Sequence, residues 1–251
     1  MARSIDPAPK AVRGFVPARN DEERYLMRHI EDLARTASSR GIARYSGFLS
    51  DREQQLAQAA LNRTDMPEDE IRFDGGWPGA ERKLLCLEPV DSYPASPLCC
   101  VRLQCRALPG AQLPVHKDYL GSLMGLELRR EALGDIVLPE DQLGVAYVFA
   151  LEPAAELICQ ELRQAGHTDL TAEMQPLETL PAFPQAERPR QTATVSSLRL
   201  DAVLAAMLRC SRGMAAELVT AGRVEINHLP AESVHAPVYE DDVFTVRGKG
   251  R

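Results

Sequence analysis

The sequence predicts an α+β protein built from more than one domain. The chain has 251 residues, of which 45% are apolar, and this is more than one hydrophobic core usually organises. Four prolines without hydrophobic periodicity lie between residues 176 and 190 and indicate a semi-extended linker. We therefore expect a small helical N-terminal unit (1–70), a mixed central domain (71–175), this Pro-rich linker (176–190) and a separate C-terminal domain (191–251).

The N-terminal unit is expected to hold two helices. The first covers residues 21–38 and has one apolar face, formed by Leu26, Ile30 and Leu33. Ser50 and Glu53 have the spacing of a capping box, which begins a second helix that runs through Asn62. A polar, Pro-containing break then separates this unit from the central domain.

The central domain is expected to alternate strands and helices. After short strands at 71–73 and 83–87, six segments follow in the order βαββαβ, at 98–107, 117–126, 136–138, 145–151, 153–165 and 170–174. This order predicts a ferredoxin-like, RRM-like sandwich of helices on an antiparallel sheet. RNA stacking on such a sheet uses aromatic side chains, and the central strands offer only Tyr147 and Phe149. A scaffolding role is therefore favoured over RNA stacking for this sheet.

The C-terminal domain is expected to hold two helices and two strands. The first helix begins near Ser196 or Ser197 and has an apolar stripe of Leu200, Val203, Leu204, Met207 and Leu208. The second has Ser211 as its N-cap and Gly222 as its stop. The strands are indicated by alternating apolar residues at 224–227 and 243–247.

The charges of this domain indicate an anion-binding surface. Arg212 lies in the first turn of the second helix, where the helix dipole opposes a cation by roughly 0.3–1 kcal/mol. A nucleic-acid phosphate held by the free N–H groups of the same helix end would compensate for this. The chain has a net charge of −7, but residues 191–251 contain 7 basic and 7 acidic residues and are neutral. Binding would thus depend on a local patch, with a salt dependence of only a few charges.

The order of residues in the C-terminal domain resembles the S4 RNA-binding domain. The resemblance rests on Arg-Leu-Asp at 199–201, Ser-Arg at 211–212, Gly-Arg-Val-Glu-Ile-Asn at 222–227 and the basic end of the chain. It implies RNA contacts by Arg199 and Arg212, with Arg223, Arg247 and Lys249. It also implies a structural role for Asp201. Arg209, which lies outside the apolar stripe of the first helix, is a further candidate for RNA contact. The chain departs from the family pattern at Gly213-Met214, where lysine-type residues are common, and at Glu240-Asp241.

The middle of the chain resembles the YlmH family of bacterial S4-domain proteins. The resemblance rests on residues 75–83, 116–126, 129–131 and 134–136 and covers essentially the whole chain. It implies a helical N-terminal domain, an RRM-like central domain and binding of structured RNA, on the large ribosomal subunit near a peptidyl-tRNA. Four central basic residues form a candidate second RNA surface or, equally, solvated surface charge: Lys83, Lys117, Arg129 and Arg130.

Other chemistry finds little support in the sequence. The six cysteines show no CxxC spacing and the five histidines no metal-ligand spacing, so we expect buried free thiols, no metal and no cofactor. The tripeptide His116-Lys117-Asp118 favours a surface or helix-start role over acid–base catalysis. No apolar run approaches the ~20 residues that span a bilayer, so we expect a cytoplasmic protein without membrane contact. We also expect a monomer.

Two classes of function remain. The first is a non-enzymatic RNA-binding protein that docks on rRNA or tRNA of the large subunit through the C-terminal arginines. The second is an RNA-modifying enzyme such as a pseudouridine synthase, because S4 domains often guide catalytic domains of that kind. Those enzymes need a catalytic aspartate in a separate large domain, and Arg-Leu-Asp occurs only once, inside the C-terminal domain. The first class is therefore favoured.

Overall fold

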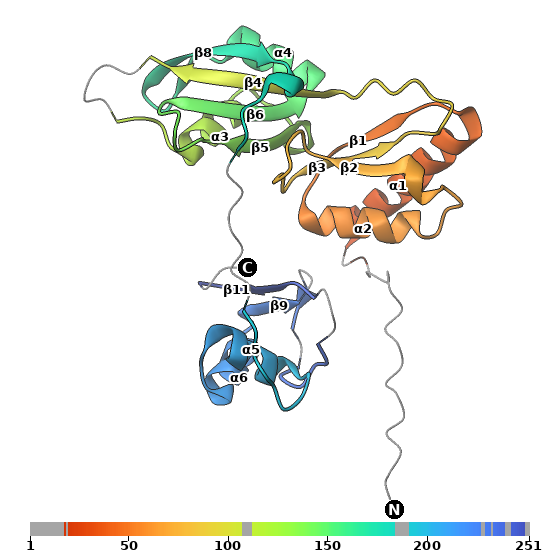
Figure 1. The fold of residues 1–251 in the computed structure, drawn as a ribbon, viewed down its shortest axis with the longest axis vertical. Coiled ribbons are helices and arrows are strands. Elements are labelled where there is room, and N and C mark those ends of the chain that lie inside the picture. The colour runs from red at the N-terminus through yellow and green to blue at the C-terminus, as the bar shows by residue number, and fades with distance from the viewer. Residues whose placement is uncertain are drawn as a thin grey trace, which may run out of the picture. The chain divides into compact units, whose positions relative to one another are not determined.

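The protein folds into two compact units, residues 1–186 and residues 187–251 (Figure 1). The computed structural model describes residue 18 and residues 20–106, 112–183, 191–226, 229–231, 233–238 and 242–248. Helix and sheet are mixed in both units, and six α-helices lie within these described ranges. Among the described residues, none of the helices is long and apolar enough to cross a membrane.

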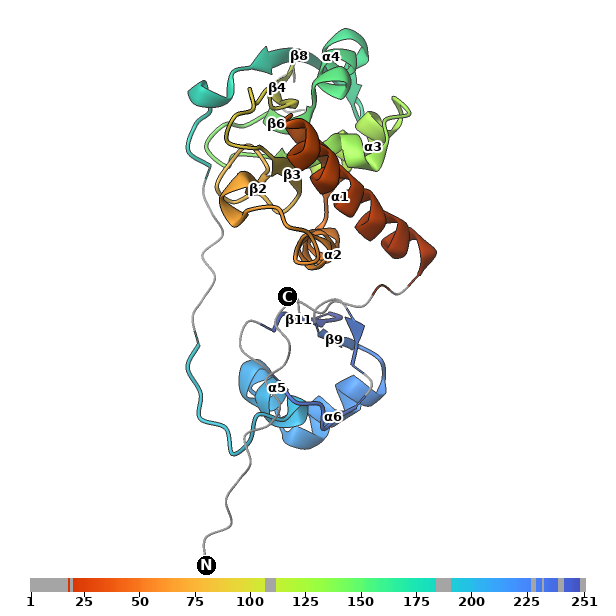
Figure 2. The same cartoon turned by 90° about the vertical axis from the view of Figure 1, so that its right-hand side faces the viewer.

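The first unit opens with two helices and a small sheet. Helix α1 (Asp21–Arg40) is capped by Asn20, and α2 (Asp51–Leu61) begins with the predicted capping box, in which Ser50 and Glu53 bond each other's backbone. The three strands are β1 (Arg44–Leu49), β2 (Ile71–Asp74) and β3 (Lys83–Leu87). They form an antiparallel sheet in the order β1-β3-β2, against which both helices pack (Figure 2).

Strand β1 was not predicted, and it means that the N-terminal part contains a strand as well as helices. The sequence indicated only helices before residue 70, whereas β1 lies between α1 and α2 and pairs with β3. Strand β3 is buried on both faces: Leu85 and Leu87 contact the helices, and Leu84 and Cys86 enter a second core on the other side. Burial raises the pKa of the Cys86 thiol to about 12, so it stays protonated.

The larger sheet lies later in the first unit. Its elements are β4 (Leu98–Cys105), α3 (His116–Met124), β5 (Leu133–Val137), β6 (Val145–Leu151), α4 (Glu152–Glu161), β7 (Gln164–Ala165) and β8 (Thr168–Gln175). The strands are antiparallel and follow the order β5-β6-β4-β8-β7. One face packs on α3 and α4 through a core that includes Tyr119, Leu123 and Ile158. The short 3₁₀ helices η1 (Glu68–Glu70), η2 (Arg130–Ala132) and η3 (Leu177–Thr179) complete the unit.

One predicted helix end in this region was wrong. Gly166 was expected to end the helix that begins at residue 153, but α4 ends at Glu161. The chain then forms β7, and Gly166 lies in the turn to β8 with φ of 59°. A left-handed glycine serves a tight hairpin as well as a helix stop, so the residue type alone does not distinguish the two.

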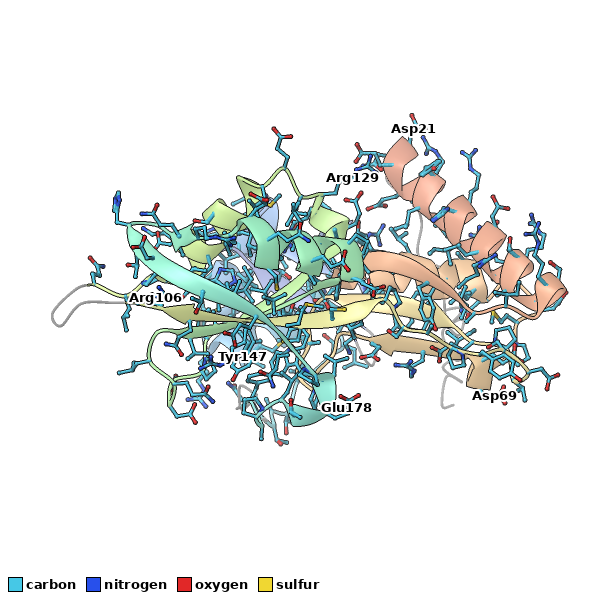
Figure 3. The ribbon with its side chains drawn as sticks, turned by 90° about the horizontal axis from the view of Figure 1, so that it is seen from above. Asp21, Asp69, Arg106, Arg129, Tyr147 and Glu178 are labelled. Carbon is cyan, nitrogen blue, oxygen red and sulfur yellow. The ribbon has the colours of Figure 1, made fainter. Side chains whose placement is uncertain are left out.

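The second face of the large sheet is covered by the protein's own chain. Tyr147 and Phe149 lie on this face and are buried. Phe183, which follows η3, makes edge contacts with both rings, with centroids 5.0 Å from Tyr147 and 6.3 Å from Phe149. Figure 3 shows Tyr147 among crowded side chains. The two aromatics that an RRM-type sheet would offer to RNA are therefore already packed against protein.

A carboxylate and a guanidinium join the two sheets of the first unit. The carboxylate of Asp135 on β5 accepts hydrogen bonds from the Trp77 indole (3.3 Å) and the backbone N–H groups of Glu81 (2.8 Å) and Arg82 (3.1 Å). Arg82 in turn donates to the carbonyl oxygens of Leu133 (2.9 Å), Phe48 (2.8 Å) and Arg130 (3.1 Å). Burial, and next the charge of Arg130, lower the pKa of Arg82. The loop between β2 and β3 is thus tied to β5.

The second unit contains two helices and a small sheet. Helices α5 (Leu200–Leu208) and α6 (Arg212–Thr220) pack on each other, and β9 (Val224–Ile226) lies between β10 (Leu229–Pro230) and β11 (Phe244–Val246). Ser211 caps α6 and Gly222 follows it with φ of 64°, as predicted. The predicted start of α5 near Ser196 or Ser197 was wrong, because its N-cap is Arg199.

Candidate RNA-binding site

One carboxylate in the first turn of α5 lies between two guanidinium groups, one at the N-cap of α5 and one at the start of α6. Arg199 donates from Nε and Nη2 to the two oxygens of Asp201, both at 3.1 Å. Arg212 donates to Asp201 Oδ2 from Nη2 at 2.8 Å and from Nε at 3.3 Å. The Asp201 side chain is only 8% exposed, whereas those of Arg199 and Arg212 are 41% and 51% exposed. The buried acid therefore holds two accessible cations side by side.

The backbone fixes this geometry from a distant part of the sequence. Arg199, just before α5, is extended and pairs with Pro237. The first two N–H groups of the helix bond to the same segment: Leu200 N–H donates to Ala236 O (2.9 Å) and Asp201 N–H to Val234 O (3.1 Å). This pairing explains why α5 begins only at Leu200. Ser211 then accepts the N–H of Met214 and sets the start of α6, which makes Arg212 the first helical residue.

Part of the positive charge of the two arginines is compensated within the protein. Burial raises the pKa of Asp201, but hydrogen bonds and positive charge from Arg199 and Arg212 outweigh it and lower the pKa to about 2. Asp201 is thus ionised and neutralises one of two cations. It also supplies the anion that a cation in the first turn of α6 requires, a role that the sequence had assigned to a phosphate. One positive charge is left over.

Replacing Asp201 with asparagine is expected to destabilise the second unit in a pH-dependent way. At pH 6 the loss should be about 1–3 kcal/mol, because two guanidinium groups lose their charged acceptor. The pKa of Asp201 is lowered by folding, so its contribution is present above about pH 4 and is lost as the pH falls toward 2. Amide hydrogen exchange of α5 and α6 in the full chain should show a smaller difference at pH 3 than at pH 6. An equal difference at both would contradict this assignment.

His235 is a site residue that the sequence did not indicate. A nitrogen of its ring, Nδ1, lies against Nη2 of Arg199. A guanidinium group only donates, so in this contact Nδ1 can act only as the acceptor. His235 is exposed and lies in the segment that pairs with residues 198–201. No motif or periodicity surrounds it, so only the fold identifies it as part of the cluster.

The other predicted basic residues of this unit form no single group with the cluster. Arg223 and Arg247 lie beside each other where β9 and β11 pair, and Arg223 Nη2 donates to the carbonyl oxygen of Arg247 at 2.7 Å. Arg209 is exposed at the C-cap of α5 with a left-handed backbone, φ 51°. Within the described residues no contact joins these three arginines to Asp201. Lys249 lies outside the described residues.

The four basic residues of the first unit are spread over different elements. Lys83 begins β3, Lys117 is exposed in the first turn of α3, and Arg129 and Arg130 lie at the start of η2. Arg129, which is labelled in Figure 3, is exposed and reaches Glu131 at 4.0 Å. No contact between described residues joins Lys83 or Lys117 to these arginines. The structure thus brings together no single central surface from these four positions.

The described part of the chain offers neither a metal site nor a disulfide. Within those residues no group of three or more His, Cys, Asp or Glu side chains is placed to hold a metal ion. All six cysteines are free, and burial raises the pKa of Cys100, like that of Cys86, to about 12. Cys86 and Cys100 therefore behave as small apolar side chains rather than as nucleophiles.

Comparison with known proteins identifies both the C-terminal unit and the chain. The S4 domain family matches residues 198–244, which contain the arginine cluster. The ribosome-associated protein quality control protein P2 of Bacillus subtilis (strain 168) is 32% identical over 236 residues, which are 93% of this chain and 88% of that protein. The solved structure of the cell division protein ylmH from Streptococcus pneumoniae matches with a TM-score of 0.50 at 13% identity. That match covers 67% of this chain and 100% of that one, and it shows a likeness of fold alone. The chain belongs to the YlmH family of bacterial S4-domain RNA-binding proteins.

Proposed function

We propose that this chain is a non-enzymatic, ribosome-associated RNA-binding protein that docks its S4 domain on rRNA or tRNA of the large subunit. The observation that carries the proposal is the pair of exposed guanidinium groups, Arg199 and Arg212, held on the buried carboxylate of Asp201. It lies inside the segment that matches the S4 family. The name of the Bacillus subtilis relative supports the ribosomal setting.

The chemistry of the cluster suits phosphate. The Nη1 groups of Arg199 and Arg212 donate to no described residue, and neither do the backbone N–H groups of Arg212 and Gly213. A phosphate placed there would meet two oriented guanidinium groups and the positive end of α6. Arg223 and Arg247 would meet a second stretch of backbone. Such contacts read no bases, so the target would be recognised by its shape.

The proposed function includes a domain organisation, a cellular location and an oligomeric state. The first unit would comprise an N-terminal domain and a ferredoxin-like, RRM-like central domain, joined by the Pro-rich linker to the S4 domain. The strand order β5-β6-β4-β8 supports the ferredoxin-like assignment. The protein would act in the cytoplasm as a monomer, with no cofactor and no membrane partner.

Co-sedimentation with purified ribosomal subunits tests this function. The wild-type chain is expected to pellet with large subunits and not with small ones, more weakly as salt rises, with a slope of a few charges. Excess tRNA should compete if tRNA forms part of the site. Equal binding to both subunits, or none, would contradict the proposal. Mass spectrometry of the recovered RNA completes the test, since a stoichiometric new modification would replace the proposal with an RNA-modifying enzyme.

A further inference from the structure

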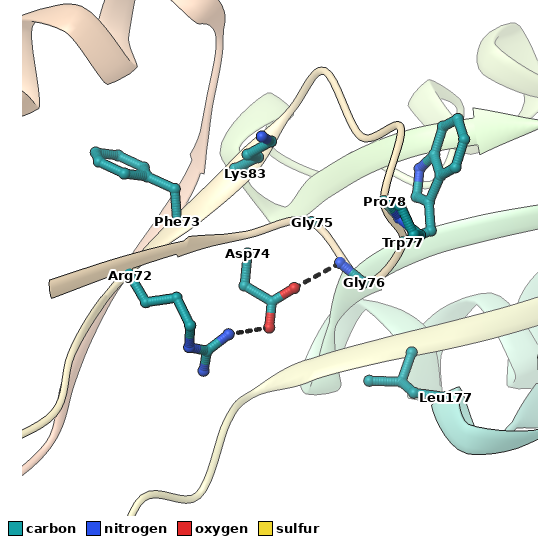
Figure 4. A pocket seen from close by; sticks show the side chains of 9 residues that line it. All are labelled: Arg72, Phe73, Asp74, Gly75, Gly76, Trp77, Pro78, Lys83 and Leu177. Atoms are coloured by element: carbon teal, nitrogen blue, oxygen red, sulfur yellow. Dashed lines mark hydrogen bonds and ion pairs between the residues drawn. The ribbon is translucent and has the colours of Figure 1, made fainter. Parts of the chain in front are cut away.

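A cleft in the first unit has the composition of a nucleotide site. It has a volume of about 520 Å³ and lies between the end of β2, the loop that follows and the start of β3, with Leu177 of η3 on another side (Figure 4). We propose that this cleft binds one unstacked nucleotide of single-stranded RNA, with its phosphate on Lys83 and its base against the apolar wall that includes Trp77. The inference rests on the proposed RNA-binding function and adds a second site to it, in the other unit of the chain.

The charges in the cleft leave one cation for a ligand. Arg72 is exposed, but its charge is already paired with the carboxylates of Asp74 and Glu88, the latter at 3.2 Å. Lys83 also lines the cleft, and its ammonium group forms no ion pair or hydrogen bond with any described residue. A phosphodiester carries one negative charge and would pair with this lysine. The carboxylate of Asp74 opposes a ligand of higher charge, which favours a single phosphodiester over a polyphosphate.

The apolar wall of the cleft is fixed in place before any ligand arrives. The indole of Trp77 is half-buried, donates to Asp135 at 3.3 Å and meets the Phe183 ring edge-on with centroids 5.6 Å apart. The turn below it is rigid: Gly76 has φ of 86° and its N–H donates to Asp74 at 2.9 Å. A Cβ at Gly76 would lie 2.5 Å from the Phe149 ring, so only glycine fits. An immobile wall of this kind lowers the entropy lost on binding.

Size and lining together point to a nucleotide. Clefts of roughly 300–1,000 Å³ suit ligands of drug size, a range that includes one nucleotide unit. A flat apolar group and a single unpaired cation that line one cleft match a base and its phosphate, and base–aromatic contact contributes about 1–3 kcal/mol. An acidic peptide would use the lysine but would leave the apolar wall empty. The same RNA that binds the S4 domain would bring such nucleotides close to the chain.

The fluorescence of Trp77 reports on this cleft alone, because the chain contains one tryptophan. Titrating the full chain with a uridine hexanucleotide is expected to give a saturable change in emission. The change should persist when Arg199 and Arg212 are both replaced with glutamine, and its midpoint should rise at least tenfold in Lys83→Ala. Lys83→Arg should restore most of the affinity. Arg28→Ala, which removes an exposed cation from α1, should have no effect.

Each contrary outcome overturns the inference separately from the proposed function. The cleft assignment fails if Trp77 emission does not respond to RNA that the chain demonstrably binds, or if Lys83→Ala responds like the wild type. It also fails if polyglutamate or inorganic polyphosphate gives the same change as the hexanucleotide, since a peptide or anion site would then be present. Circular dichroism of each variant shows whether a lost response is due to unfolding of the variant. If the S4 proposal fails instead, the chain does not co-sediment with ribosomal subunits, but its Trp77 emission still responds to the hexanucleotide.

Discussion

Replacing Arg199 and Arg212 together with glutamine is expected to weaken binding to the ribosomal RNA target on the order of 100-fold at moderate salt. Charge-assisted hydrogen bonds contribute about 1.5–3 kcal/mol each, and a loss of about 2.7 kcal/mol is a hundredfold change in affinity. The slope of log affinity against log salt should flatten by roughly 1.4–1.8, because two phosphate contacts are lost. Affinity measured at several salt concentrations gives both quantities. Glutamine keeps hydrogen-bond donors near the buried Asp201.

A matched pair of substitutions separates this site from general electrostatics. Arg28 and Arg40 are exposed on α1 in the other unit, and changing both to glutamine removes the same charge from the chain. Binding by that variant should stay within about threefold of the wild type, since scattered surface charge adds little at moderate salt. Equal losses in the two pairs would show that the arginine cluster has no special role. Hydrogen exchange of α5 and α6 verifies that the first pair leaves the S4 domain folded.

Those parts of the fold that depend on local pattern could be predicted from the sequence. The capping box of Ser50 and Glu53 and the bounds of β6 at 145–151 both follow from side chains adjacent in the chain. Strand β1 could not be predicted in this way, because it lies between two helices and is defined by its pairing with β3. The predicted start of α5 was wrong for the same reason. Pairing with residues 234–238 keeps the preceding residues extended, and this overrides two good capping serines.

The candidate site was predictable to a similar extent. The order of residues singled out Arg199, at the N-cap of α5, and Arg212, at the start of α6. It did not show that they lie together, because a short turn places the end of α5, rather than its start, beside the start of α6. The anion beside Arg212 was misjudged, because the sequence could not show that Asp201, in the first turn of α5, reaches Arg212 on α6 as well as Arg199. His235 is 36 residues from Arg199 and joins the cluster only through a long-range pairing. Tertiary contacts, rather than residue type, decide these positions.

Replacing Asp135 with alanine is expected to lower the free energy of unfolding of the first unit by about 3 kcal/mol, because three donors lose one charged acceptor. Two of these donors are the backbone N–H groups of Glu81 and Arg82, which fix the loop before β3. The third is the indole of Trp77. Denaturant unfolding of the full chain, followed by circular dichroism and by Trp77 emission, measures the change in midpoint. Asp135→Asn keeps one acceptor oxygen and should lose less.

Asp141→Ala provides the control, since Asp141 is an exposed carboxylate in the loop before β6 and its loss should change stability by no more than about 0.5 kcal/mol. Amide exchange in α5 and α6 should not change in Asp135→Ala, because those helices belong to the other compact unit. A loss of stability shared by both units would mean that they unfold together. An unchanged midpoint would mean that the bonds to Asp135 are replaced by water without loss. The loop at 75–83 would then be held to β5 by Arg82, which donates to the carbonyl oxygens of Leu133 and Arg130 independently of Asp135.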